Sequence, residues 1–234
     1  VANIAQALTY DAPPAGETIF DLGGDAYQRT VYRCATCGHF ISRAAFDVTA
    51  LYGGDYMDAT YAGDRLRATY DRIMALPESQ SDNTARVARV VARAGAGGRA
   101  LDVGSGLGVF PARLREAGWS VVALDPDPRA VEHTAAVAGV EAVCADFFDA
   151  DVSALGRFDL VTFNKVLEHV EDPVLMLRRA QDLLRPGGLR TSNCRTGRRQ
   201  PRGGRLARSS SSNTCTCSPC HPSYCSLIRP AFAC

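Results

Sequence analysis

The chain has 234 residues, of which 46% are hydrophobic, and its formal net charge at pH 7 is +1. This length and composition are sufficient to bury one large hydrophobic core or two unequal ones. No apolar run approaches the ~20 residues that a membrane-spanning helix needs, and no signal peptide is recognisable. The sequence therefore predicts a soluble, cytoplasmic protein and excludes an integral membrane protein.

The charge is divided unevenly along the chain. Residues 190–234 contain eight arginines and no acidic residue, so residues 1–189 hold 18 basic against 25 acidic side chains and carry about −7. Six of the nine cysteines also lie in residues 190–234. An acidic main body does not favour contact with a phosphate backbone, so we expect no nucleic-acid partner.

Residues 1–78 are rich in Gly, Tyr and Asp and show little periodicity, which predicts a small, irregular N-terminal domain. Cys34 and Cys37 form a Cys-x-x-Cys turn followed by Gly-His, which is typical of half a zinc knuckle. A structural zinc needs four ligands, and no second cysteine pair lies nearby. Two interpretations stay open: a zinc site completed by residues upstream of Val1, with His39 as a further ligand, and two plain thiols beside a turn histidine.

The next segment, residues 79–189, changes to long periodic patterns. A helix predicted over residues 85–94 leads into an apolar run that ends at Asp102. Three alternating glycines follow, and then a second helical pattern begins near Val109. This order predicts a strand, a tight turn and a helix whose free N–H groups point at the turn.

The glycine turn consists of Gly104, Ser105, Gly106, Leu107 and Gly108. Glycines adopt backbone angles that are closed to other residues and carry no side chain, so a ligand can lie directly on the turn. The carboxylate that precedes it would repel a pyrophosphate but suits a cation or an ammonium group. Because valine stands where a dinucleotide fingerprint has its third glycine, a nicotinamide cofactor is the weaker alternative.

Three further apolar runs, at residues 119–124, 140–145 and 158–163, alternate with helical patterns that begin at Pro128 and Pro173. This alternation predicts an α/β fold with a doubly wound parallel sheet, whose ligands bind at the carboxyl ends of the strands. The runs end at polar residues that therefore belong to the predicted site: Asp125, Asp146 with Phe147, and Asn164. Asp125, 21 residues after the first glycine of the turn, is placed to accept the hydroxyls of a ribose, and Asp146 with its neighbouring aromatic to bind and cover an adenine.

Five motifs in this order resemble class I S-adenosylmethionine-dependent methyltransferases: Leu-Asp-Val-Gly-Ser-Gly-Leu-Gly, the acid Asp125, Ala-Asp-Phe at 145–147, Phe-Asp-Leu-Val followed by Val-Leu-Glu-His-Val at 158–170, and Leu-Arg-Pro-Gly-Gly at 184–188. The resemblance implies that Asp102 and the glycine turn hold the amino-acid end of the cofactor, Asp125 its ribose, and Asp146 with the Phe147 backbone its adenine. The Cys-x-x-Cys stretch resembles the zinc-binding N-terminal region of some members.

The implied activity is methyl transfer to a small-molecule acceptor, with a sugar or secondary metabolite as the expected class. In this family's arrangement His169 lies in the loop that faces the methyl group, so it is the candidate base for an acceptor proton. Glu168 would orient His169 or hold a metal. The open alternative is that both side chains only pack and cap their loop, because many methyltransferases use no essential base.

Residues 190–234 lack both a strand period and a helix period. We therefore expect the family pattern to end at residue 189, with no strand after Gly188 and a disordered tail. Its four closely spaced cysteines at 215–225 fit a metal cluster and its arginines a nucleic-acid arm, but a reading-frame shift explains the Arg, Ser, Pro and Cys content better. The second function hypothesis is therefore a truncated product that binds cofactor weakly and catalyses nothing.

Overall fold

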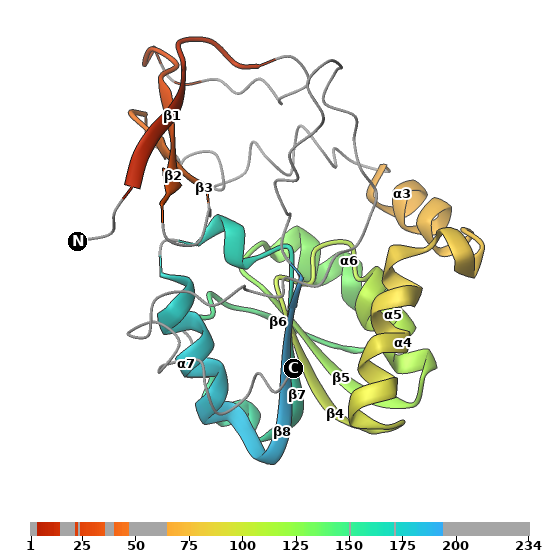
Figure 1. Ribbon diagram of the computed structural model, residues 1–234. Helices are drawn as coiled ribbons and strands as arrows, with labels where there is room; N and C mark the ends of the chain where they lie inside the picture. The colour runs from red at the N-terminus through yellow and green to blue at the C-terminus, as the bar shows by residue number, and fades with distance from the viewer. Residues whose placement is uncertain are drawn as a thin grey trace. The chain divides into compact units, whose positions relative to one another are not determined.

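The computed structural model describes residues 4–14, 22, 24–35, 40–46, 65–149, 151–170 and 172–193, which fall into two compact units, 4–46 and 65–193 (Figure 1). The Tyr-rich stretch at 51–61 and the predicted tail from residue 194 onward lie outside the described residues. No helix in the described part of the chain is both long enough and apolar enough to cross a membrane.

The first unit is a three-stranded antiparallel sheet of order β1-β2-β3, formed by Ile4–Tyr10, Arg29–Cys34 and Phe40–Ala44. The irregular fold predicted for this region is wrong for these segments. A register shift between Gln6 and Leu8 breaks the alternation of β1, and arginines instead of apolar neighbours cover the aromatic rings. Arg29 stands 5.2 Å over the ring of Tyr10, for example, so the strands do not show an apolar period of two.

The second unit contains a five-stranded parallel sheet of order β6-β5-β4-β7-β8. Its strands and α-helices, in chain order, are α3 (Arg65–Met74), α4 (Asp82–Ala94), β4 (Gly98–Val103), α5 (Val109–Glu116), β5 (Trp119–Asp125), α6 (Pro128–Ala138), β6 (Glu141–Cys144), β7 (Phe158–Asn164), α7 (Pro173–Leu183) and β8 (Leu184–Asn193). Short 3-10 turns lie at Glu78–Gln80, Val152–Leu155 and Leu167–His169. The predicted α/β doubly wound fold is therefore confirmed.

Helix α3 packs with the second unit, although the sequence places the domain boundary after residue 78. Tyr70, its buried residue, lies in one cluster with Val109 of α5 and Ala138 of α6. The Tyr70 hydroxyl donates a 3.1 Å hydrogen bond to the carbonyl of Val137. These contacts group residues 65–74 with the parallel sheet.

Side-chain caps fix where three of the helices start. Ser81 before α4, Asp127 before α6 and Asp172 before α7 each accept a hydrogen bond from a backbone N–H two or three residues further on, at 3.2, 2.8 and 2.8 Å. Pro128 and Pro173 occupy the first helical position, where a missing N–H costs nothing. The predicted starts of α6 and α7 are confirmed.

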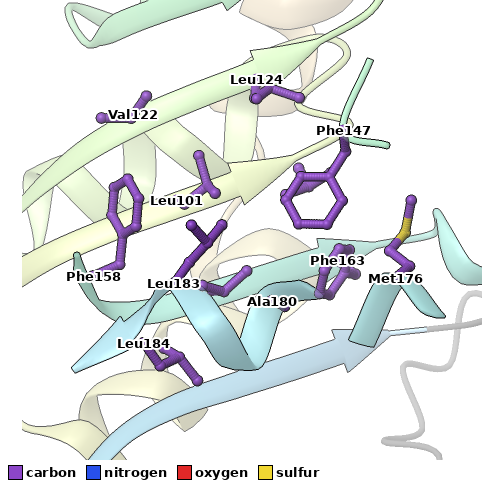
Figure 2. Close-up of a cluster of buried hydrophobic side chains, with 12 residues drawn as sticks. Leu101, Val122, Leu124, Phe147, Phe158, Phe163, Met176, Ala180, Leu183 and Leu184 are labelled. Carbon is purple, nitrogen blue, oxygen red and sulfur yellow. The ribbon is translucent and has the colours of Figure 1, made fainter. Parts of the chain in front are cut away.

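Hydrophobic side chains fill both faces of the sheet. On one face, apolar residues of the strands meet helices α4 and α5; they are Ala100, Val121 and Leu160 against Val87, Val90, Phe110 and Leu114. On the other face the strands meet α7, as Figure 2 shows for Leu101, Val122, Leu124, Phe163, Met176, Ala180 and Leu183. Because both faces are covered, β4, β5 and β7 are apolar runs without alternation.

Strand β8 corrects the expectation that no strand follows Gly188. It pairs in parallel with β7 from Leu189 to Asn193, after a register shift between Phe158 and Leu160. The hydrogen bonds between neighbouring strands are formed by main-chain groups. The polar sequence Arg-Thr-Ser-Asn can therefore pair with the main chain of β7. Arg190 is buried there and lies against α7, where it donates to the carbonyl of Leu177 at 3.2 Å and to the side chain of Gln181.

Candidate functional site

The order of the strands places the site at the carboxyl ends of β4 and β7. Chain progression runs outward from β4 to β5 and β6 on one side and through β7 to β8 on the other. The point where the strand order reverses is where open α/β sheets bind ligands, because the connections leave a crevice there. Asp102 of β4 is in register with Thr162 of β7, so their side chains meet at this point.

Asp102 is buried and receives two hydrogen bonds from β7 on one carboxylate oxygen. The hydroxyl of Thr162 donates to Oδ1 at 2.5 Å, and the amide nitrogen of Asn164 donates to the same atom at 2.9 Å. Burial raises the pKa of Asp102 to about 7, against the opposing effects of these two bonds and of the charge of Arg86. A carboxyl group with this pKa can exist with and without its proton near neutral pH.

Arg86 supplies positive charge near this carboxylate from helix α4. It is buried, and its guanidinium forms an ion pair with Asp82 one turn earlier. Its Nε is buried without a hydrogen-bond partner among the described residues. A buried donor without a partner is costly, so this atom has capacity to bind an acceptor group from a ligand.

The glycine turn joins β4 to α5 as the sequence predicts. Gly104, Gly106 and Gly108 have φ of 70°, 51° and 71°, in the left-handed region that favours glycine. A Cβ on Gly104 would stand 2.5 Å from the side chain of Val166, and one on Gly108 would stand 2.9 Å from Oγ1 of Thr134. These two glycines are therefore required by the packing of the turn itself.

The middle of the turn is different, because it borders open space. A Cβ on Gly106 would meet no described atom within 4 Å. Beside it, the hydroxyl oxygen of Ser105 is buried and has no hydrogen-bond partner among the described residues. The carbonyl of Gly106 accepts a 3.1 Å hydrogen bond from the hydroxyl of Thr134 in α6. The turn thus combines a free surface with an unsatisfied polar atom.

Asp125 ends β5 and faces the turn. Its Oδ2 accepts a 2.9 Å hydrogen bond from the N–H of Gly106, and its Oδ1 accepts a 3.0 Å bond from the N–H of Asp127. Burial raises the pKa of this carboxyl, while the two N–H groups favour its charged form. Each carboxylate oxygen can accept a second hydrogen bond, so the hydroxyls of a ribose can still bind.

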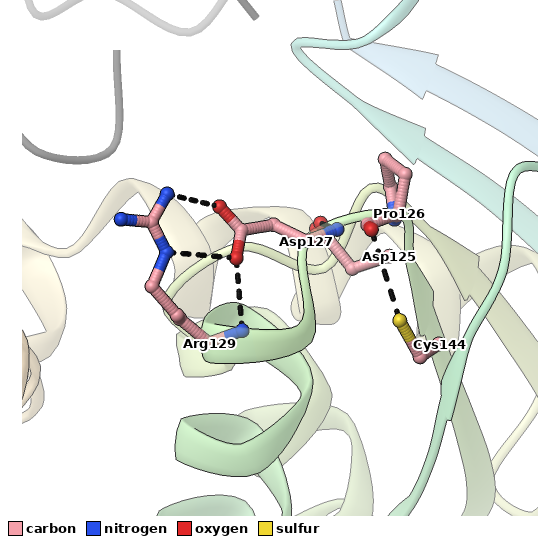
Figure 3. A network of polar contacts seen from close by, with 5 residues as sticks. All are labelled: Asp125, Pro126, Asp127, Arg129 and Cys144. Atoms are coloured by element: carbon pink, nitrogen blue, oxygen red, sulfur yellow. Dashed lines mark hydrogen bonds and ion pairs between the residues drawn. The ribbon is translucent and has the colours of Figure 1, made fainter. Parts of the chain in front are cut away.

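The loop after Asp125 is held by its own polar contacts, which Figure 3 shows. Both carboxylate oxygens of Asp127 pair with the guanidinium of Arg129, at 2.9 and 3.1 Å, and the hydrogen bond from this side chain lowers the pKa of Asp127. On the far side of the loop, Sγ of Cys144 lies 3.7 Å from the carbonyl oxygen of Pro126. These contacts hold the loop between β5 and α6 and connect it to Cys144 at the end of β6.

Asp146 and Phe147 follow β6 at the carboxyl end of the sheet, and their side chains lie in different surroundings. Asp146 is exposed, and its Oδ1 accepts a 2.6 Å bond from the N–H of Phe148. Phe147 is buried, and its ring packs at 84° against that of Phe163, with centroids 5.8 Å apart. The ring of Phe147 therefore belongs to the core and cannot cover an adenine, whereas its backbone remains a predicted contact.

Glu168 and His169 lie in the 3-10 turn that follows β7, and both are exposed. The N–H of His169 donates a 2.8 Å bond to the carbonyl of Val166, which closes the turn. The structure thus places the two candidate catalytic residues in the loop after Asn164, at the end of the sheet that also carries the predicted cofactor-binding residues. Their catalytic role stays a prediction.

The predicted zinc ligands are only partly described. Cys34 is the last residue of β2, while Cys37 and His39 lie outside the described residues. Within the described ranges, no three His, Cys, Asp or Glu side chains gather into a group that could hold a metal ion.

Three contributors to the site were not predicted from the sequence. Thr162 is a polar residue between Val161 and Phe163 in β7, and its polarity at a buried position of that strand was the available signal. Thr134 and Arg86 occupy positions in amphipathic helices that look like ordinary surface residues, so only the fold reveals that both are buried against the site.

The fold and the site together define a cofactor-binding α/β domain. A glycine turn and three strand-end carboxylates lie together at the carboxyl end of its parallel sheet. A family model described as "Methyltransferase domain" matches residues 75–196, slightly more than half of the chain. The chain belongs to this methyltransferase family, as the five sequence motifs predict.

The chain is also similar to curated relatives. A ubiquinone biosynthesis O-methyltransferase of Xanthomonas oryzae pv. oryzae is 39% identical over 99 residues, which are 40% of this chain and 41% of the relative. One from Cereibacter sphaeroides is 35% identical over 108 residues, or 44% of this chain and 43% of the relative. The chain thus spans less than half the length of these relatives.

The chain is also similar to parts of solved structures. The N-terminal domain of EvdMO1 with SAH bound is 30% identical, with a TM-score of 0.40, and the match covers 44% of this chain and 46% of that one. N-methyltransferase NodS from Bradyrhizobium japonicum WM9, in complex with S-adenosyl-L-homocysteine, is 20% identical, with a TM-score of 0.43. This match covers 56% of this chain and 73% of that one.

Proposed function

We propose that residues 65–193 bind S-adenosylmethionine and that the protein transfers its methyl group to a hydroxyl of a small molecule. The observation that carries the proposal is the pair formed by a buried carboxylate, Asp102, and an adjacent glycine turn with open space at Gly106, both at the switch point of the sheet. The family match and the names of the relatives support it.

The polar groups of the site suit both ends of this cofactor. Its amino-acid end carries an ammonium and a carboxylate; Asp102 would accept from the first, and the unpartnered Nε of Arg86 would donate to the second. The hydroxyl of Ser105 has no partner among the described residues and would bind at the turn. Asp125 would accept from the ribose hydroxyls, and Asp146 with the Phe147 backbone would bind the adenine.

When bound, S-adenosylmethionine supplies a methyl group that its sulfonium already activates. The protein then contributes alignment, for which effective concentrations are large. A hydroxyl acceptor must lose a proton, and His169 in the exposed 3-10 turn is the proposed base. Glu168, its neighbour, would orient the imidazole.

The class of acceptor rests on the relatives. They are named O-methyltransferases of ubiquinone biosynthesis, which supports a hydroxyl on a small organic molecule as the acceptor. A sugar or another secondary metabolite is the narrower proposal from the sequence. Zinc at Cys34 and Cys37 also stays a proposal, and it requires further ligands beyond this pair.

The experiment is a transfer assay with methyl-labelled S-adenosylmethionine and matched panels of hydroxylated and amine acceptors. We expect label in hydroxylated products, a large loss with His169→Ala and a smaller loss with Glu168→Gln. Glu116→Gln is the control, because Glu116 ends α5 at the opposite end of the sheet. Label only in amine products would contradict the O-methyl assignment, and no transfer to any acceptor together with no cofactor binding would favour the inactive product.

A further inference from the structure

One residue in the loop after β7 has a backbone conformation that its side chain disfavours. Lys165 has φ of 62°, and it is the one residue other than glycine with positive φ in the described part of the chain. The left-handed region costs about 1–2 kcal/mol for an ordinary L-residue. Such conformations persist only where surrounding contacts hold them, and they concentrate at functional sites.

The contacts that hold this conformation come from three different elements. Before the turn, Asn164 donates to the carboxylate of Asp102 on β4. At the turn, the N–H of Lys165 donates a 2.6 Å hydrogen bond to the carbonyl of Asn193, the last residue of β8. After the turn, Val166 packs against Gly104 so closely that a Cβ there would stand 2.5 Å from its methyl group.

The chain direction after Lys165 decides where the candidate catalytic residues lie. The carbonyl of Val166 accepts from the N–H of His169, so the 3-10 turn with Glu168 and His169 is built on the residue that contacts the glycine turn. The bonds of Asn164 and of the Lys165 N–H fix the chain before the N–Cα bond of Lys165, so a change of Lys165 to negative φ would move the chain after it and take Val166 away from Gly104.

We propose that Lys165 is a positioning residue: its left-handed backbone, tied to the end of β8, sets the catalytic loop against the cofactor turn. This inference rests on the proposed function, because it assigns the loop a role in cofactor and acceptor geometry. It also gives β8 a role besides extending the sheet, because Asn193, the last residue of that strand, anchors the loop. The role belongs to the backbone conformation and not to the ammonium group.

Three substitutions of Lys165 separate the effect of its backbone conformation from the effect of its charge. Lys165→Gly and Lys165→Asn both remove the ammonium but accept positive φ, since glycine has no Cβ and asparagine tolerates the left-handed region. Lys165→Val also removes the ammonium, and its β-branched side chain disfavours positive φ most strongly. The affinity for S-adenosylhomocysteine, measured by calorimetry on the full chain, and amide exchange of residues 165–170 are the two readouts.

We expect Lys165→Val to weaken S-adenosylhomocysteine about 5- to 30-fold, the change that 1–2 kcal/mol gives, and to speed amide exchange at His169. Lys165→Gly and Lys165→Asn should stay within about threefold of the wild type. Equal losses in all three variants would show that the ammonium matters, and three unchanged variants would show that the turn does not position the site. Either result overturns the inference, whereas failure of the wild type to bind would instead count against the proposed function.

Discussion

Replacing Asp102 with asparagine should make the protein more stable at pH 8 and a poorer binder of cofactor. Thr162 and Asn164 both donate to Oδ1 of Asp102, and the amide oxygen of an asparagine can accept the same two bonds. The substitution therefore keeps the shape and the hydrogen bonds but removes the buried charge. It also removes the carboxylate that we assign to the ammonium of the cofactor.

The magnitude follows from the pKa of this carboxyl, which is 3.8 when exposed and about 7 in the fold. Because the folded protein binds the proton more tightly than the unfolded chain does, stability falls as pH rises above the unfolded pKa, and the fall is complete above the folded one. At 1.36 kcal/mol for each pKa unit, the full penalty is at most about 4 kcal/mol. The asparagine does not titrate, so its stability advantage should grow by about 2–3 kcal/mol between pH 5 and pH 8.

Urea unfolding at pH 5, 6, 7 and 8 measures this advantage directly. Trp119 is the single tryptophan of the chain and is buried in the same unit, so its fluorescence reports the transition. Asp159→Asn is a matched control with the opposite sign. The N–H of Arg99 and the side chain of Arg185 both donate to Asp159 and lower its pKa below the ordinary 3.8, so this variant should lose stability by an amount that stays constant from pH 5 to pH 8.

The reasoning would be refuted by an advantage of Asp102→Asn that stays constant from pH 5 to pH 8, or by a variant less stable than the wild type at pH 8. Cofactor affinity provides the second half of the test. S-adenosylhomocysteine should bind the asparagine variant at least tenfold more weakly at pH 8, as expected when a charge-assisted hydrogen bond of about 1.5–3 kcal/mol is lost. Greater stability with unchanged affinity would show that Asp102 does not contact the ligand.

Four further changes test other parts of the site. Gly104→Ala should destabilise the fold by about 1–3 kcal/mol in urea unfolding, because its Cβ meets Val166 at 2.5 Å in a left-handed conformation. Gly106→Ala faces open space, so it should fold with a smaller loss but weaken S-adenosylhomocysteine at least tenfold by calorimetry; full affinity would place the ligand elsewhere. Arg86→Met should weaken the same ligand about 10- to 100-fold, and an unchanged Kd would remove Arg86 from the carboxylate contact. His169→Ala should lower kcat for a hydroxyl acceptor about 10²–10⁴-fold with cofactor affinity unchanged, and a parallel loss of both would indicate a structural role.

Much of the second unit could be predicted from the sequence because local signals agree there. Pro128 and Pro173 follow capping aspartates, the three glycines follow an apolar strand, and Asp125 lies at the spacing expected for a strand-helix-strand unit. Each of these features depends on neighbouring residues, which a sequence displays directly.

The features that could not be predicted depend on contacts between distant segments. Strand β8 continues to Asn193 because β7 supplies a main-chain edge, although the side chains there are polar. The ring of Phe147 turns into the core because Phe163, sixteen residues later, offers a partner. The ties from Thr162 to Asp102 and from Thr134 to Gly106 also join residues far apart in the chain, and no local pattern marks them.

Isothermal titration of the full chain with S-adenosylhomocysteine tests the central claim most directly, with NADH and Asp125→Ala as comparisons. We predict one site for S-adenosylhomocysteine, no heat with NADH, and a marked loss of affinity when Asp125 no longer accepts from the ribose. Binding of NADH instead, or binding of S-adenosylhomocysteine that Asp125→Ala does not weaken, would contradict the account. The carboxyl end of the parallel sheet would then not be the S-adenosylmethionine site.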